Sequence, residues 1–208
     1  MQKIKKNRLI FIGIFALIGF LTLQIPIARL VGSKASFTLF DAFAPTAGGF
    51  LGSLPGVIAV FLMQTLNFIV HGAQIQDAGT IIRFLPPLLA TLYFSKRIKI
   101  NIIIPALAIL AFNLHPIGRT VWYYSLYWLI PILCHFLRDR SVLARSFGAT
   151  FTAHAVGGAL WIYAFNPPPS VWINLIPVVA AERTFFALGI TFAYVLITNV
   201  IHALEKRW

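Results

Sequence analysis

Long continuous apolar segments fill most of the chain, and short polar or charged stretches separate them. Apolar and polar positions do not alternate within these segments, which favours helices over the strands of a β-barrel. In hydrocarbon, only helices and closed barrels satisfy all of their backbone hydrogen-bonding groups. The pattern therefore predicts an all-α fold, a polytopic transmembrane bundle of about six to eight helices, in a single integral membrane domain over residues 1–208.

The apolar runs predict helices at Leu9–Ala28, Phe37–Ser53, Val57–His71, Thr80–Phe94, Ile100–Leu114, Val121–Leu137, Val142–Phe165 and Val171–Leu204. The second and third are short, since a span needs about 20 apolar residues, so they form either two crossings or a tight hairpin that does not fully cross. The last is too long for one straight span unless it is tilted, is broken near Pro177 or projects from the membrane. We divide the domain into N-terminal helices at 9–95, a possible extra hairpin at 98–137 and a C-terminal pair at 142–204.

The composition is that of a membrane protein, with 59% hydrophobic and only 11% charged residues, against about 25% charged in soluble domains. A net charge of +12 would suggest nucleic acid for a soluble protein, but here the basic residues gather at helix ends, beside a lipid bilayer. With eight crossings, one side carries Lys3, Lys5, Lys6, Arg8, Lys96, Arg97, Lys99, Arg138, Arg140, Arg145, Lys206 and Arg207, and the other carries Arg29, Lys34, Arg83 and Arg119. The positive-inside bias predicts a multi-pass protein of the plasma (inner) membrane, with N- and C-termini cytoplasmic and no nucleic-acid partner.

Several motifs of catalysis and cofactor binding are absent from the sequence. No glycine-rich phosphate loop precedes a Lys-Ser/Thr pair, so the chain does not hydrolyse ATP itself. The histidines show no metal-ligand spacing, and acidic residues are few. We therefore expect no enzyme activity, no metal and no cofactor. An enzyme with His154 and Glu182 as acid and base is the weakest alternative, because no third catalytic group accompanies them.

The last two apolar segments form a hairpin that carries polar groups deep in the membrane. His154 shares a helical face with Gly158 and Trp161 in the first arm. Glu182 and Arg183 interrupt the second arm at a comparable depth. Ionisable groups inside a span are costly, so they mark a candidate functional site.

Two interpretations of this hairpin remain open. In one, Glu182 pairs internally with Arg183 or His154 and fixes the helix packing. In the other, the hairpin forms a substrate-binding pocket, whose expected residues are His154, Trp161, Tyr163, Trp172, Glu182, Arg183, Arg119 and Tyr123. Tyr123 belongs to an aromatic run that could instead be an interfacial belt. Arginine, histidine and tryptophan at one level suit an aromatic or weakly anionic small-molecule substrate.

Small residues at helical spacing mark positions where another helix can approach closely. The predicted positions of partner-helix packing are Gly13, Ala16 and Gly19 in the first segment and Gly48, Gly52 and Gly56 across the second and third. Such close contacts are also compatible with a structural or assembly subunit of a membrane protein complex that has no ligand of its own.

Three stretches resemble the substrate-binding S components of energy-coupling factor (ECF) vitamin transporters. The second and third helices of that family resemble FTLFDAFAPTAGGFLGSLPG at Phe37–Gly56. Its fifth helix resembles FTAHAVGGALW at Phe151–Trp161, and its sixth resembles the run after Trp172. The resemblance implies uptake of a vitamin-like small molecule, energised by a separate transmembrane coupling subunit and two ATPase subunits.

The resemblance also implies where a ligand would lie. In that family the substrate sits near the outer face, among the last three helices and the outer loops. The matching residues here are His154, Trp161, Glu182 and Arg183, with the loop Gly72–Gly79 as a lid.

Two features depart from the family pattern. Family members usually have six helices, so Ile100–Leu137 is an extra hairpin. Their first helix commonly carries Ala-x-x-x-Ala for docking, whereas here Gly13, Ala16 and Gly19 lie three residues apart. The second departure bears on whether the coupling partner is the family's usual one.

Overall fold

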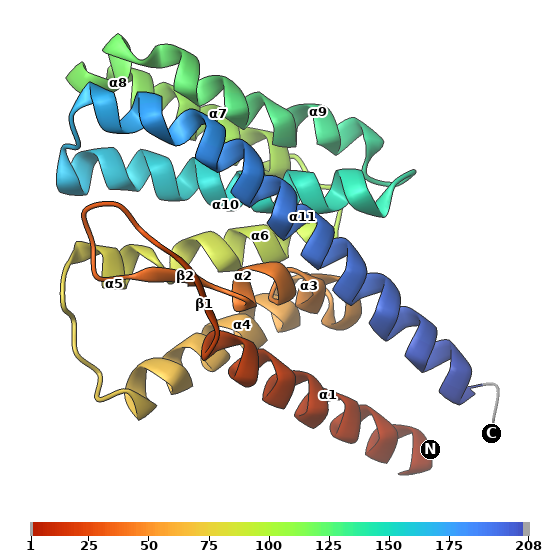
Figure 1. The fold of residues 1–208 in the computed structure, drawn as a ribbon. Helices are drawn as coiled ribbons and strands as arrows, with labels where there is room; N and C mark the ends of the chain where they lie inside the picture. The colour runs from red at the N-terminus through yellow and green to blue at the C-terminus, as the bar shows by residue number, and fades with distance from the viewer. Residues whose placement is uncertain (1, 206–208) are drawn as a thin grey trace.

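The computed structural model describes residues 2–205 and the side chains of residues 11–204, and most of it is helical (Figure 1). The helices are α1 (Gln2–Leu23), α2 (Phe40–Phe43), α3 (Thr46–Leu51), α4 (Ser53–Val70), α5 (Ala78–Ile82), α6 (Leu85–Ser95), α7 (Ile100–Leu114), α8 (Pro116–Thr120), the 3₁₀ helix η1 (Trp122–Trp128), α9 (Leu129–Leu137), α10 (Val142–Phe165) and α11 (Pro169–Glu205). A short antiparallel ribbon joins β1 (Pro26–Arg29) to β2 (Ser36–Thr38). The all-α prediction is confirmed. The basic side chains of Lys3, Lys5, Lys6, Arg8, Lys206 and Arg207 lie outside the described part.

Three helical stretches are long and apolar enough to cross a membrane: Ser53–Val70, Ala78–Ser95 and Pro169–Leu204. Phe11–Leu23 and Ile100–Leu114 are apolar but shorter. Many large apolar side chains are exposed on the outer faces of these helices, as contact with lipid requires. The chain therefore has the character of a membrane protein, while six to eight crossings and cytoplasmic termini stay predictions.

The helix α10 is the centre of the bundle and packs against α6, α7, α9 and α11 (Figure 1). It has the predicted bounds, because local signals fix both ends. The Ser141 hydroxyl accepts a hydrogen bond from the Ala144 amide at 3.2 Å, and Asn166 ends the helix in a left-handed conformation. Since most of α10 packs against other helices, it is rich in small residues, such as Gly148 beside the Tyr93 ring.

The predicted end of the first helix, Ala28, was wrong. The helix α1 ends at Leu23, and the residues from Pro26 to Arg29 form β1 instead. Pro26 accounts for this end, because a proline disfavours the helical conformation of the residue before it. It lies opposite Thr38 in the ribbon, so Phe37 and Thr38, expected to begin the second helix, are extended as well.

Three other predicted helices are divided. The segment 37–53 holds the short helices α2 and α3, and 121–137 begins as the 3₁₀ helix η1 before continuing as α9. The segment 80–94 holds α5 and α6, with Pro86 and Pro87 in the first turn of α6, where a missing amide proton breaks no helical hydrogen bond. The predicted extra hairpin corresponds to α7 and the returning α9, both packed against α10.

The last helix, α11, is continuous over 37 residues with Pro177 inside it. At 1.5 Å per residue it is about 55 Å long, which exceeds the roughly 30 Å of a hydrocarbon core. A break near Pro177, one of the expected alternatives, does not occur. Figure 1 shows α11 crossing the other helices obliquely, so that one helix contacts both the N-terminal and the C-terminal parts of the bundle.

Most of the glycines predicted to contact a partner pack inside the chain. Their neighbours are Thr91 for Gly48, Ala47 for Gly56 and Met63 for Gly19. Gly52 joins α3 to α4 with a φ of +92°, a conformation that glycine adopts readily. Ala16 packs against the core that contains Phe15 and Met63. Gly13, like Gly52, has no neighbour within 4 Å of the position that a Cβ atom would take.

Candidate functional site

A cavity of about 260 Å³ lies between α10, α11, the α5–α6 segment and the β1–β2 ribbon. Five of the predicted site residues line it: His154, Trp161, Trp172, Glu182 and Arg183. The polar face of α10 and the charged pair of α11 thus border one space. This is the arrangement that a binding pocket in the hairpin requires.

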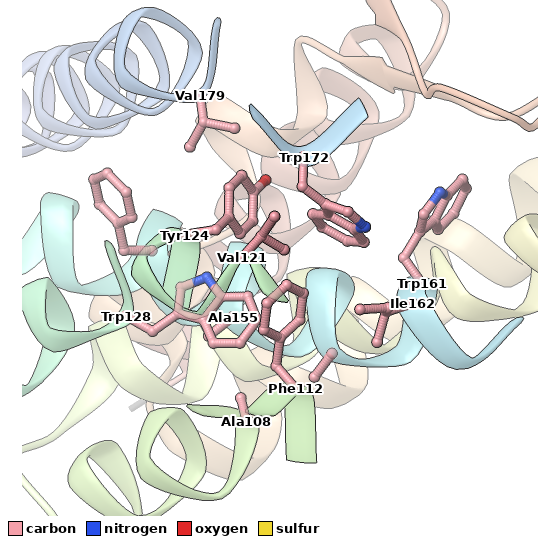
Figure 2. Packing of buried hydrophobic residues seen from close by; sticks show 12 residues of the cluster. Ala108, Phe112, Val121, Tyr124, Trp128, Ala155, Trp161, Ile162, Trp172 and Val179 are labelled. Atoms are coloured by element: carbon pink, nitrogen blue, oxygen red, sulfur yellow. The ribbon is translucent and has the colours of Figure 1, made fainter. Parts of the chain in front are cut away.

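On the side of α7 and η1, Tyr124 and Trp172 line the cavity and belong to a cluster of packed aromatic rings (Figure 2). The Trp172 ring centroid lies 5.0 Å from that of Phe112 and 4.9 Å from that of Tyr124. Phe112 also meets Trp128 at 5.1 Å, edge to face. Figure 2 shows these rings in one cluster, with the Trp161 indole at its border. Interlocked rings make a rigid, largely apolar wall that suits an aromatic ligand.

His154 is held in this wall by two hydrogen bonds. Trp128 Nε1 donates to His154 Nδ1 at 3.0 Å, and His154 Nε2 lies 3.0 Å from the Tyr124 hydroxyl oxygen. An indole N–H can only donate, so Nδ1 must be an unprotonated acceptor. The ring proton is then on Nε2, which donates to the Tyr124 oxygen. His154 therefore orients Tyr124.

Arg183 is the most deeply buried charge of the site, with 2% of its surface exposed. Its guanidinium carbon lies 4.5 Å from the Phe37 ring centroid and 4.7 Å from that of Phe186. Nη2 lies 3.6 Å from a Glu182 carboxylate oxygen, beyond hydrogen-bond distance, and Nη1 lies 3.5 Å from the Thr150 hydroxyl. Within the described residues, Nε and Nη2 have no hydrogen-bond partner. The buried cation thus has donors that the protein leaves free.

A second charged pair lies near Phe37, between α2 and the end of α5. Arg83 Nη2 lies 2.7 Å from Asp41 Oδ2, and the two side chains are 17% and 7% exposed. The Thr38 amide donates to the same carboxylate oxygen at 2.9 Å. The Arg83 guanidinium also lies 4.7 Å from the Phe37 ring centroid. Asp41 and Arg83 line the cavity as a neutral pair.

The turn of the β1–β2 ribbon closes one side of the cavity. Trp161 Nε1 donates to the Val31 carbonyl oxygen at 3.0 Å. The ribbon is also fastened to the loop before α5, because the Ser33 hydroxyl and the Lys34 amide donate to the Asp77 carboxylate at 2.8 and 2.9 Å. We call these Asp77 contacts the ribbon clasp.

The loop Gly72–Gly79 was expected to be the lid, but it does not line the cavity. It holds the ribbon in place through Asp77. Gly79 is buried at this contact, where a side chain would collide with Ser33 and Trp161. The covering segment is therefore the ribbon.

The ribbon clasp has a predictable pH dependence. The backbone amide of Lys34, with further hydrogen bonds from Ser33 and Thr80, holds the pKa of Asp77 below its ordinary value. A lowered native pKa stabilises the native contact above the ordinary aspartate pKa of about 4, and this stabilisation is lost as the pH falls through the native value. We expect hydrogen exchange, corrected for intrinsic rates, to show a protected Lys34 amide from about pH 7 to about pH 5 and loss of protection below about pH 4.

The Asp77→Asn variant should reduce protection of the Lys34 amide between about pH 5 and about pH 7, where the wild-type carboxylate is ionised. Asp139→Asn is the matched control, because Asp139 lies on an exposed turn between α9 and α10. Equal protection in wild type and Asp77→Asn would contradict the clasp.

Three predicted site residues lie outside the cavity. Tyr163 is about 180° around α10 from His154 at 100° per residue, and it donates to the Ala111 carbonyl at 2.7 Å. Arg119 is exposed on α8, and Tyr123 is exposed on η1. The geometry does not bring these three side chains to the candidate site.

Sequence reasoning missed several lining residues. Asp41 and Arg83 carried a signal, because both are charges in or beside apolar segments, but nothing local indicated that they pair. Tyr124 was passed over for its neighbour Tyr123, since an aromatic run alone does not fix which ring faces inward. Phe37 was assigned to a helix and is in β2.

Within residues 11–204, no three histidine, cysteine, aspartate or glutamate side chains lie close enough together to hold a metal ion. The polar groups of the cavity are instead guanidinium, carboxylate, imidazole, hydroxyl and indole groups. No family model, no curated protein and no solved structure matches this chain.

Proposed function

We propose that the chain is the membrane-embedded substrate-binding subunit of an ECF-type transporter, an S component that takes up a vitamin-like small molecule. The observation that carries the proposal is the cavity of about 260 Å³, which has aromatic walls and a buried guanidinium with free donors. An apolar pocket with a few placed polar groups is the usual form of a small-molecule site.

The proposal includes partners, because the sequence has no phosphate loop for ATP hydrolysis. A separate transmembrane coupling subunit and two ATPase subunits supply the energy. The chain is then a multi-pass protein of the plasma (inner) membrane, with both termini cytoplasmic. Gly13 on α1 offers open space for a contact with the coupling subunit.

A structural or assembly subunit without a ligand is the alternative. In a subunit with only a structural role, we expect the buried polar groups to be hydrogen-bonded within the protein, as buried polar groups nearly always are. Arg183 and Trp172 both line the cavity and have buried donors without a hydrogen-bond partner among the described residues, which favours the binding function over the structural one.

Mass spectrometry of compounds released from the purified chain tests this proposal. The chain is extracted from its own membranes in mild detergent, washed, incubated with a small-metabolite extract of the same cells and then denatured. We expect one small molecule at roughly one per chain after correction for detergent and lipid. Absence of any such compound, with the protein folded, would favour the structural subunit.

A further inference from the structure

We propose that the cavity binds an aromatic monocarboxylate, whose carboxylate group lies against Arg183, Tyr124 and Trp172. This inference rests on the proposed function, because it names the chemical class of substrate for the same cavity. Three observations carry it: the charge of the lining, the donors that have no internal partner, and the aromatic walls.

The lining carries an excess of one positive charge. Its charged groups are the guanidinium groups of Arg29, Arg83 and Arg183 and the carboxylates of Asp41 and Glu182. Asp41 and Arg83 neutralise each other at 2.7 Å. Glu182 is the more exposed partner of Arg183 and lies 3.6 Å from it. The excess charge is that of Arg29, which is exposed at the ribbon and forms no ion pair among the described residues. A bound monoanion neutralises it, whereas a bound cation would increase it.

Hydrogen-bond donors without partners point to an acceptor on the ligand. Nε and Nη2 of Arg183 and Nε1 of Trp172 are buried and have no hydrogen-bond partner in the part of the chain that the structure describes. Both residues are 2% exposed and line the cavity. Guanidinium and indole N–H groups can donate but cannot accept. A carboxylate offers several lone pairs in a plane and pairs well with a guanidinium.

Tyr124 supplies a further donor because of how His154 is held. His154 Nδ1 accepts from Trp128, so its Nε2 proton is donated to the Tyr124 oxygen. The Tyr124 hydroxyl hydrogen is then free, since no other acceptor is found for it among the described residues. Tyr124 lines the cavity, where this hydrogen can be donated to the ligand. Because the Tyr124 oxygen accepts the hydrogen bond from His154, the Tyr124 hydroxyl hydrogen stays available for donation to the ligand.

The remaining lining favours a flat ring. The indoles of Trp161 and Trp172 border the cavity from α10 and α11, and Phe37 borders it from β2. Aromatic faces bind aromatic ligands through stacking and edge-to-face contacts. The cavity is smaller than the roughly 300–1,000 Å³ of pockets for drug-sized ligands, so it suits one small ring system with a short acidic side chain.

Isothermal titration of the detergent-purified full chain with three matched probes tests the proposal. The probes are indole-3-acetate, its primary amide and tryptamine, which share one ring and differ in the charge of the side chain. We expect the acid to bind about tenfold or more tightly than the amide, because hydrogen bonds to a charged acceptor are the stronger ones, and tryptamine to bind most weakly. An amide that binds as tightly as the acid, or a preference for tryptamine, would overturn the proposal.

A conservative variant tests the same contact without disturbing the bundle. Tyr124→Phe removes only the hydroxyl group and should reduce the acid-over-amide ratio by about fivefold to tenfold. Tyr163→Phe is the control, because its hydroxyl bonds to the Ala111 carbonyl outside the cavity. An unchanged ratio in Tyr124→Phe would remove Tyr124 from the carboxylate site.

The outcomes separate this inference from the proposed function. If none of the probes binds but the chain releases a stoichiometric compound, the class of that compound decides: an aromatic carboxylate supports the inference, and a neutral or cationic compound overturns it while the binding function stands. If no probe binds and nothing is released, the proposed function fails, and the inference fails with it.

Discussion

Replacing Gly157 by leucine is expected to abolish ligand binding and to leave the fold intact. Gly157 lines the cavity, and a Cβ atom placed on it would meet only Pro86 Cγ, at an ordinary contact distance of 3.7 Å. The rest of a leucine side chain therefore extends into the space that the ligand needs. Inside a helix, glycine is less favourable than leucine by roughly 0.5–1 kcal/mol, so the unfolding temperature should stay the same or rise. The affinity for the released compound should fall by at least roughly tenfold, or about 1.4 kcal/mol.

Gly13→Leu is the matched control for this variant. It makes the same change of helix propensity on α1, where nothing lies within 4 Å, and should keep full occupancy. Gly158→Leu is not a substitute for Gly157→Leu, because a Cβ atom there would lie 2.7 Å from the Trp128 ring and disturb the wall itself. A folded Gly157→Leu variant with wild-type occupancy would mean that the compound binds elsewhere.

Removal of the Arg83 guanidinium is expected to produce the largest loss of stability. Arg83→Gln leaves the Asp41 carboxylate, 7% exposed, without the cation that lies 2.7 Å away. Breaking a buried ion pair from one side costs about 3–5 kcal/mol, because the remaining charge is neither solvated nor paired. For a chain of this size that loss lowers the unfolding temperature by roughly 6 °C or more. Thermal unfolding in detergent measures it.

Arg97→Gln gives the comparison for an exposed pair. Arg97 lies 3.3 Å from Asp139, and the side chains are 45% and 60% exposed, so its loss should cost less than about 1 kcal/mol. The double variant Arg83→Gln/Asp41→Asn should recover part of the loss seen in Arg83→Gln, since it removes both charges. If Arg83→Gln were no less stable than Arg97→Gln, the Asp41 pair would not hold α2 against α5.

The parts of the site that could be predicted from the sequence depend on local signals. The cap at Ser141 and the turn after Phe165 define α10, and these signals act within one helical turn. His154, Gly158 and Trp161 recur at helical spacing, and all three line the cavity. The length of the apolar segments and the charged residues within them indicated the hairpin as the candidate site. Both features can be recognised without knowing which helices are neighbours.

The contacts that complete the site join distant parts of the chain, and no local pattern specifies them. Arg83 is 42 residues from Asp41, and Trp161 is 130 residues from the Val31 carbonyl to which it donates. The ribbon that contains Val31 depends on pairing between β1 and β2, so its sequence alone resembled the end of a helix. The loop Gly72–Gly79, expected to be the lid, consequently lies outside the lining of the cavity.

Rotation about a helix axis explains the remaining errors. Tyr163 was grouped with Trp161, although two residues correspond to about 200° of rotation. The aromatic run at 122–128 was expected to be α-helical, and it is a 3₁₀ helix in which Tyr124 is buried and Tyr123 is exposed. A shift of one position along η1 decides whether the ring of Tyr123 or that of Tyr124 packs against α10. The aromatic composition of the run does not specify this position.

A diffraction map of the chain crystallised as purified from its own membranes tests the binding function most directly. We expect density for one small planar molecule between Trp161 and Trp172, with an acidic group within hydrogen-bond distance of Arg183. A closed cavity, with the Arg183 donors satisfied by Glu182 and no density between the two indoles, would contradict it.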